Sequence, residues 1–363
     1  MNNKLEACRN TSISQIGRGI RKVVFVCGYI KDLVLEADKH IEFLEDPDAL
    51  TDEFDGLDDE QVQELKCNWQ RSHTALQELC RLLPNFQKKI DEGNPEELSE
   101  YYSKLQLGAN NARSDDLNRI WECLAEWLNH SQPTPSPLLV KEKRDNRGLH
   151  HDTTGRLLCP AEFEWDDPEV RVKLRAGEEG YDWLSSNYAR AFYANHKANP
   201  QRLEDGFLKS TVLVKVYKSI FTSPSSVADV ADDLESDQEN EPASKVAKLF
   251  QSRKKPTKRN VASKLHMNDK VTPRSIAYAA VLLHYNLQTA ERWYEIYGGF
   301  DYCVLYNEIV DYFEDVPTPA AKKRAQDLMN WWTAKVFPEA AVRRQSNTSA
   351  SRKAMREQRA ARI

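Results

Sequence analysis

RLLCPAEFEWDDPEVR, residues 156–171, opens the segment around which the rest of this chain is arranged. The segment closes with YKSIFTSPSS at residues 217–226. Within it, Asp167 is suited to cap a helix whose first residue is Pro168. Gly177 is placed to end that helix. The opening of the segment therefore predicts a short, well-delimited helix.

The flanking residues extend this helical pattern. A charged insertion at 227–268 interrupts it, and TPRSIAYAA at 272–280 resumes it with a threonine cap followed by proline. Residues 152–159 differ, since Asp152–Gly155 predicts a tight turn and Arg156–Cys159 an extended segment after it. The other helices are predicted at Ser186–Asn195, Gly206–Phe221, Phe300–Glu314 and Thr318–Val336.

Two heptad patterns come before this region. Apolar residues are spaced three and four apart from Ile13 to Leu44, which predicts a helix of about 30 residues. A second such pattern runs from Val62 to Ile90, after an acidic loop. Because one loop joins two apolar stripes of matching length, we predict an antiparallel helical hairpin.

Helix-breaking residues divide the stretch that follows. Gly93-Asn94-Pro95 ends the second heptad helix, with Asn94 as the cap of the next one. We predict a short amphipathic piece at Leu98–Leu105 and a separate helix that starts near Ser114. QPTPSP at 132–137 is a stiff connector and marks a domain boundary.

The predicted fold class is mostly α: a long antiparallel N-terminal helical hairpin and a C-terminal helical domain interrupted by a disordered charged insertion. The predicted parts are an N-terminal domain with long heptad helices (1–130), a Pro-rich linker (131–150), the C-terminal domain (151–338, with the insertion at 227–268) and a basic tail (339–363).

Composition fits a soluble globular protein with polar segments added. The 363 residues are 40% hydrophobic and 29% charged. The longest strongly apolar run, Val23–Ile30, is far shorter than the roughly 20 residues that span a bilayer, so we expect no membrane segment. Seven scattered cysteines without a C-x-x-C pair predict reduced thiols in an intracellular protein, mostly as small core residues.

The formal net charge of −5 hides strong local asymmetry. Residues 229–241 hold seven acidic side chains and no basic one, whereas 242–268 hold eight Lys or Arg and no Asp or Glu. The tail at 343–363 holds seven Lys or Arg against Glu357 alone. Charge must therefore be considered segment by segment.

Several motifs resemble a known family. RLLCPAEFEWDDPEVRVKLRAG (156–177), GFLKSTVLVKVYKSIFTSPSS (206–226) and TPRSIAYAAV (272–281) are similar to an uncharacterised fungal, basidiomycete-type family carried as a domain of unknown function. The resemblance covers roughly Ile16 to Pro338. It implies one continuous fold with a variable insertion, and it implies no catalytic residue, substrate or cofactor.

A metal-ligand cluster is one candidate for chemistry. His150, His151 and Cys159 offer three of the four nitrogen or sulfur ligands that zinc takes, without paired spacing or a local fourth ligand. The alternative is a polar turn followed by a buried cysteine, which we prefer, and we assign no metal or cofactor.

Crowded carboxylates between Glu162 and Glu169 are a second candidate. They suit Mg²⁺ binding or acid–base work, or the negatively charged start of a helix. The sequence holds no Walker A loop, G-x-G-x-x-G or G-x-S-x-G motif. An enzyme with a site near His150–Asp167 is therefore kept as an alternative.

The basic segments carry the preferred hypothesis. The cluster Arg253–Arg259 resembles a nuclear-import signal. Its side chains could also contact phosphates without recognising a particular nucleotide sequence. We predict a non-enzymatic, intracellular and nuclear interaction protein whose basic flexible segments contact nucleic acid or a chromatin partner. A self-associating helical scaffold, hence a homo-oligomer, is the other alternative. The predicted contact residues are Arg253, Lys254, Lys255, Lys258, Arg259, Arg352, Lys353 and Arg356.

Overall fold

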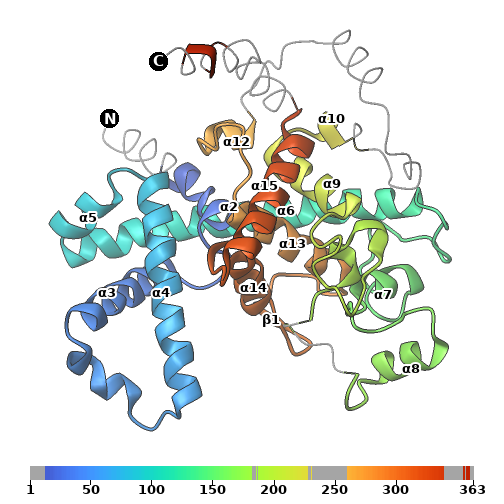
Figure 1. The fold of residues 1–363 in the computed structure, drawn as a ribbon, viewed down its shortest axis with the longest axis horizontal. Helices are drawn as coiled ribbons and strands as arrows, with labels where there is room; N and C mark the ends of the chain where they lie inside the picture. Colours follow the sequence, from blue (N-terminus) through green and yellow to red (C-terminus); the bar gives the residue numbers. More distant parts are fainter. Residues whose placement is uncertain are drawn as a thin grey trace.

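The protein is mostly α-helical, as the sequence predicts (Figure 1). The computed structural model describes residues 13–181, 185, 187–227, 230, 260–338, 355 and 357–359. After a helical segment at 13–17, the N-terminal elements are α2 (Ile20–Val23), α3 (Ile30–Glu45), η1 (Pro47–Phe54), α4 (Asp59–Leu82), α5 (Phe86–Glu92) and α6 (Pro95–Asn129).

Shorter elements alternate with longer helices in the rest of the chain. In order they are α7 (Asp152–Leu158), α8 (Pro168–Ala176), η2 (Arg190–Phe192), η3 (Ala194–His196), α9 (Thr211–Phe221), α10 (Pro224–Val227), α12 (Val261–Lys264), α13 (Pro273–Leu287), β1 (Ile296–Tyr297), β2 (Phe300–Asp301), α14 (Tyr302–Glu314) and α15 (Pro319–Val336). β1 and β2 form a small antiparallel hairpin that the sequence did not predict.

α3 and α4 form the predicted antiparallel hairpin, which projects from the body at the lower left of Figure 1. Ile30, Val34 and Ala37 of α3 are buried in one cluster with Leu76 and Leu79 of α4. The first heptad helix is nevertheless shorter than predicted. Gly28 adopts a left-handed φ of 72°, which interrupts the helix between α2 and α3.

α6 is one continuous helix, so the prediction of two pieces on either side of residues 106–113 is wrong. Small residues in its middle let the N-terminal segment cross it closely. A Cβ on Gly108 would clash with the carbonyl oxygen of Ser14, and one on Gly17 with that of Leu105. Packing against the crossing segment therefore favours a helix where glycine and asparagine lower its intrinsic propensity.

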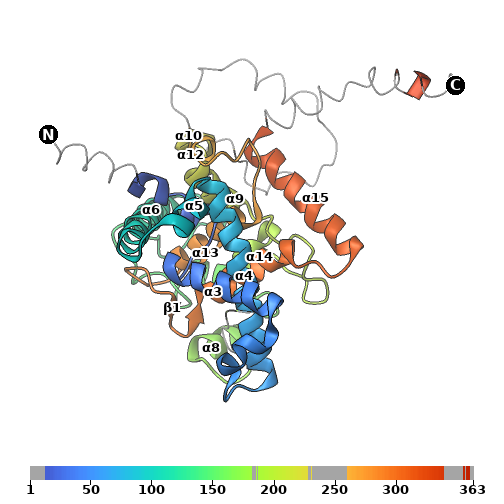
Figure 2. The same cartoon turned by 90° about the vertical axis from the view of Figure 1, so that its left-hand side faces the viewer.

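α13 is the central helix of the molecule (Figures 1 and 2), and fourteen of its fifteen residues are buried. Thr272 caps it by accepting from the Ser275 N–H at 3.2 Å, ahead of Pro273, as predicted. A helix this apolar on every side must be surrounded. Its neighbours are α2, α6, α7, α9 and α14.

The structure corrects two local predictions and confirms one. Asp152–Leu158 forms helix α7 in place of a turn and an extended segment, because His151 caps it by accepting from the Thr153 N–H. The helix predicted at Ser186–Asn195 is reduced to the 3₁₀ turns η2 and η3. α8 begins and ends as predicted, with the Asp167 cap and left-handed Gly177.

Two hydrophobic clusters adjoin within α6. Leu105 and Ala109 belong to the cluster of the N-terminal hairpin, whereas Leu117 and Leu128 belong to the larger core around α13. The domain boundary at 131–150 stays a prediction. The predicted insertion lies largely outside the described residues, since only 227, 230 and 260–268 of it are described.

The expectation that the cysteines are unpaired is wrong for one pair. Cys27 and Cys303 form a disulfide, with Cα atoms 5.8 Å apart and a sequence separation of 276. Spacing along the chain could not show that the loop before α3 meets the first turn of α14. Among the other described cysteines, Cys159 is buried and Cys67, Cys80 and Cys123 are half-buried.

Candidate functional site

The predicted contact residues Arg253, Lys254, Lys255, Lys258, Arg259, Arg352, Lys353 and Arg356 all lie outside the described residues. The structure does describe the part of the folded body that these segments adjoin in sequence. The basic cluster Arg253–Arg259 lies between α10 and α12 in sequence, and the tail follows α15. α10, α12 and the C-terminal end of α15 lie at the same end of the molecule (Figures 1 and 2).

Both departure points are anchored in the main core. Asn260 caps α12 by accepting from the Ser263 N–H at 2.8 Å, and Ala262 behind it is buried. Val336 and Phe337, at the end of α15, are buried in the same cluster. The Thr333 hydroxyl accepts from the Val271 N–H at 3.5 Å, which ties α15 to the segment after α12. The two basic segments therefore start from one rigid surface.

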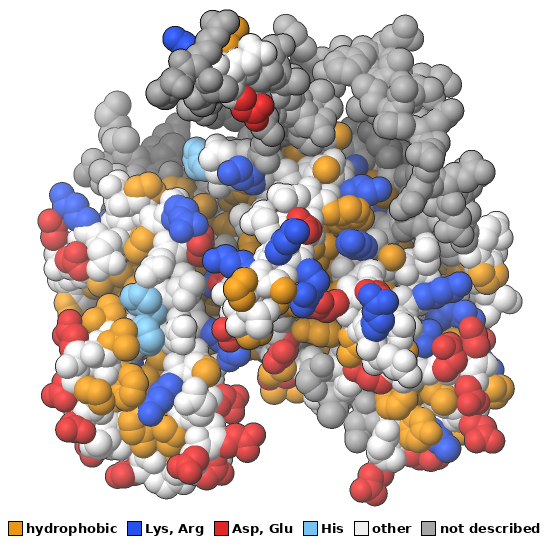
Figure 3. Space-filling view, viewed as in Figure 1, with side chains coloured by type: hydrophobic (Ala, Val, Ile, Leu, Met, Phe, Trp, Pro, Cys, Tyr) orange, Lys and Arg blue, Asp and Glu red, His pale blue; other side chains and the backbone are white. Residues whose placement is uncertain are grey.

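Positively charged side chains gather on the body near this end (Figure 3). Lys209 and Lys335 lie on the Trp331 ring of α15, with their amino nitrogens 5.9 and 5.6 Å from its centroid. Lys322 and Lys323 are exposed at the other end of α15, in its first turns. The lysine pair around Trp331 supplies both charge and an aromatic surface.

The region His150–Asp167 does not assemble the suggested metal cluster. His151 is buried; its Nδ1 accepts from the Thr153 N–H, and its Nε2 lies 2.9 Å from the Pro137 carbonyl oxygen. Cys159 is fully buried, and burial is the largest cause that raises its pKa to about 12, which disfavours the thiolate. His150 is exposed. Each residue therefore has a structural role or faces solvent.

Three of the crowded carboxylates of this region also contact different partners. Asp167 caps α8, Glu164 pairs with Arg190 at 3.2 Å, and Asp166 pairs with Arg156 at 2.7 Å. These three carboxylates therefore already serve a helix cap or an ion pair. The preferred interpretation of these residues as a helix start agrees with the cap on α8.

A cleft lies between the α3–α4 hairpin and α14, with a volume of about 510 Å³. The loop Phe25–Tyr29 and Glu295 complete its lining, and the Cys27–Cys303 bridge is part of the wall. The charged side chains that line it are Asp32, Glu36, Glu295, Asp311, Glu314, Asp315, Arg71 and Arg274. Carboxylates outnumber guanidinium groups, so the cleft is acidic.

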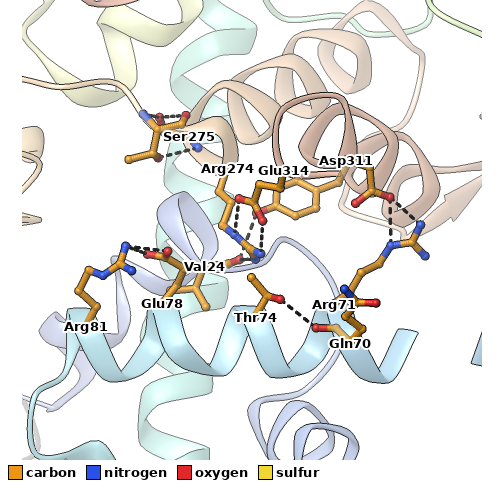
Figure 4. A network of polar contacts seen from close by, with 12 residues as sticks. Val24, Gln70, Arg71, Thr74, Glu78, Arg81, Arg274, Ser275, Asp311 and Glu314 are labelled. Atoms are coloured by element: carbon orange, nitrogen blue, oxygen red, sulfur yellow. Dashed lines mark hydrogen bonds and ion pairs between the residues drawn. The ribbon is translucent and has the colours of Figure 1, made fainter. Parts of the chain in front are cut away.

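One ion pair crosses the cleft from α4 to α14, and a second joins α13 to α14 beside it (Figure 4). Arg71 of α4 donates to Asp311 of α14 from Nε and Nη2, at 3.1 and 2.6 Å. Arg274 donates to both carboxylate oxygens of Glu314, at 3.2 and 2.9 Å, and to the Val24 carbonyl oxygen at 2.6 Å. The Arg274–Glu314 pair is bidentate, and such pairs are stronger and more directional than single contacts.

The sequence did not indicate this cleft. Its residues come from five separate parts of the chain, and most are ordinary polar or apolar positions within their own helices. The only available signal was that Cys27 falls on the first heptad stripe and Cys303 lies next to the predicted apolar face of 300–314. Neither position specifies a partner.

Fold and surfaces thus define the class: a mostly α-helical body with an acidic cleft, from one end of which two basic segments depart. Among the described residues, no helix combines the length and apolarity needed to cross a membrane. The chain belongs to the family of unknown function DUF6698, whose model matches residues 107–337. The match begins in the middle of α6, close to where that helix enters the main core. No curated protein and no solved structure matches the chain.

Proposed function

We propose that the chain is a non-enzymatic nuclear interaction protein whose two basic segments contact nucleic acid or a chromatin partner. The observation that carries the proposal is the shared origin of the segments: both depart from the end of the body formed by α10, α12 and the end of α15. Two segments held at one end can engage the same polyanion, and the second contact then forms at a high effective concentration.

The charge on the body supports the same arrangement. Lys264 and Lys270 are exposed beside α12, and Lys335 is exposed in the last turn of α15. Acidic residues lie at the far tips, over η1 and around α8 (Figure 3). A polyanion approaching the molecule is therefore attracted to the end that carries the basic segments.

Contact would be mainly with phosphates. The two segments at 242–268 and 343–363 contain Phe250 as their only aromatic residue, so they lack rings for stacking on bases. Phosphate contacts are independent of sequence, and non-specific affinities are typically on the order of micromolar or weaker. Trp331 between its two lysines is an aromatic contact that the body offers near this end.

The test neutralises the basic clusters in the full-length chain. Changing all eight predicted contact residues to Ala should weaken binding to random-sequence DNA at least about tenfold. Changing only Arg253, Lys254, Lys255, Lys258 and Arg259 should move a tagged protein out of the nucleus. The matched control removes five positive charges from the N-terminal helices, at Lys31, Arg81, Lys88, Lys89 and Lys104, and should change neither result. A wild-type protein found in the cytoplasm would end the nuclear part of the proposal.

Two further expectations stay proposals. The fungal origin that the sequence motifs imply is one. The other is self-association through the N-terminal heptads: Ile41 and Leu44, at the far end of the first stripe, are exposed and offer apolar surface to a second copy.

A further inference from the structure

Two sulfur atoms and one carboxylate meet at the wall of the acidic cleft. Cys27 comes from the loop before α3, Cys303 from the first turn of α14, and Glu295 directly precedes β1. Their potential ligand atoms all lie within 4.8 Å of one another, and among the described residues this is the one group of His, Cys, Asp and Glu side chains so placed. Three distant segments therefore converge on one point.

The position of each member is fixed by its surroundings. Glu295 accepts from the Gly28 N–H at 3.0 Å, which holds the carboxylate against the loop that carries Cys27. Arg21 donates to the carbonyl oxygens of Cys27 and Gly28, both at 2.7 Å, and so orders the same loop. The left-handed φ of Gly28 brings these groups together. The convergence is thus built into the fold.

The ligand set suits zinc. Thiolate and carboxylate are both common ligands of Zn²⁺, with Zn–S near 2.3 Å and Zn–O near 2.0–2.2 Å. Tetrahedral coordination then places two thiolates about 3.8 Å apart, so modest side-chain rotation of the two cysteines would open room for the ion. Both cysteines are half-buried in the cleft wall, which leaves a fourth position open to water. Such three-ligand sites are typical of reactive rather than purely structural zinc.

The charge of the surroundings is compatible with this ion. Two thiolates and Glu295 carry three negative charges, and a divalent cation leaves one. The guanidinium groups of Arg21 and Arg113 lie within electrostatic range of Glu295 and offset the remainder. The other two arginines near the cleft, Arg71 and Arg274, are already paired with Asp311 and Glu314.

We propose that Cys27, Cys303 and Glu295 form a binding site for a soft divalent cation, Zn²⁺ by ligand type, when the bridge is reduced, and that the disulfide is the oxidised, metal-free state of the same pair. Reduction takes two electrons and two protons from a dithiol, which is itself oxidised to a disulfide. Metal binding then displaces the two thiol protons. The proposal does not depend on nucleic-acid binding.

Cobalt titration of the reduced full-length protein tests the site. Co²⁺ bound by thiolates gives a sulfur-to-metal charge-transfer band, and we expect one equivalent to bind and Zn²⁺ to displace it. Cys27→Ser and Cys303→Ser should each abolish the band, and Glu295→Gln should weaken binding at least tenfold while both cysteines stay intact. Cys67→Ser, at another thiol that lines the cleft, should leave the titration unchanged.

The oxidised protein is the second comparison, and it should give no charge-transfer band. The proposal is overturned if the reduced wild-type protein gives no band. It is equally overturned if the band persists in Cys27→Ser and Cys303→Ser, or is lost in Cys67→Ser. Circular dichroism of Glu295→Gln should match the wild type, so that a weaker titration reports the lost ligand.

Discussion

A buried charge pair joins the first helices to the centre of the molecule. Lys22 of α2 and Asp116 of α6 form an ion pair, and both are almost fully buried. The Tyr278 hydroxyl of α13 donates to the same Asp116 carboxylate at 2.9 Å. Burial is the main reason that the pKa of Lys22 lies well below its ordinary value. The cation therefore depends on Asp116 to offset its desolvation.

Removing that carboxylate should be costly. We expect Asp116→Ala to destabilise the protein by about 3–5 kcal/mol, because it leaves a buried lysine without its counter-ion. The neighbouring Asp115 pairs with Arg18 at 2.7 Å on the surface, so Asp115→Ala should cost at most about 1 kcal/mol. Denaturant unfolding of the two variants gives both values. Equal small losses would show that Lys22 is stabilised by other groups.

A buried histidine should make stability depend on pH. His284 of α13 stacks on Phe300 with centroids 4.3 Å apart, and burial lowers its pKa to about 3. Its unfolded pKa is near 6.5, so between these values the unfolded chain binds a proton that the folded chain does not. The free energy of unfolding therefore keeps the full contribution of neutral His284 above about pH 6.5. It decreases as the pH falls, by about 2 kcal/mol at pH 5.

His284→Phe should therefore reduce the pH dependence of unfolding between about pH 6.5 and 4, while His196, whose pKa burial lowers to about 4, keeps its own contribution. His130 is exposed, so His130→Phe should leave the wild-type dependence in place. The measurement is the midpoint of denaturant unfolding at several pH values for all three proteins. An unchanged slope in His284→Phe would mean that this side chain does not titrate between the folded and unfolded states.

At the scale of elements, the close crossing of the N-terminal segment over α6 should limit which residues fit. Gly108→Ala would raise helix propensity by about 1 kcal/mol in isolation. We expect a lower melting temperature instead, because the added Cβ would clash with the Ser14 carbonyl oxygen. Asn111→Ala, at an exposed position three residues further along, should be neutral or slightly stabilising. If Gly108→Ala raises the melting temperature, the crossing is not close.

Local signals in the sequence predicted much of the helical architecture. The heptads gave the α3–α4 hairpin, and Thr272-Pro273 gave the start of α13, because caps and apolar stripes depend on neighbouring residues. The continuity of α6 was missed because it depends on Ser14 and Gly17, about 90 residues away in sequence. The Cys27–Cys303–Glu295 group was missed for the same reason. Contacts between distant segments leave little trace in a single sequence.

At the scale of the whole molecule, the charge distribution links the fold to the proposed function. The acidic cleft lies on the α3–α4 side, and acidic side chains gather at the two lower tips in Figure 3, whereas exposed lysines lie beside α12 and in the last turn of α15. The body would thus repel a polyanion on one side and support its contact with the basic segments on the other. Because the charges are separated in this way, we expect nucleic acid to bind at one end of the molecule.

The most direct test of this account is the affinity for random-sequence DNA at two salt concentrations, with and without residues 242–259 and 339–363. Each phosphate contact releases counterions, so six contacts would lower the affinity by roughly 10³-fold between about 50 and 200 mM salt. The account predicts this steep loss for the full-length chain. It also predicts no binding, with helical content retained, once both segments are removed. Binding that survives their removal, or that does not respond to salt, would place the contact on the folded body and contradict the account.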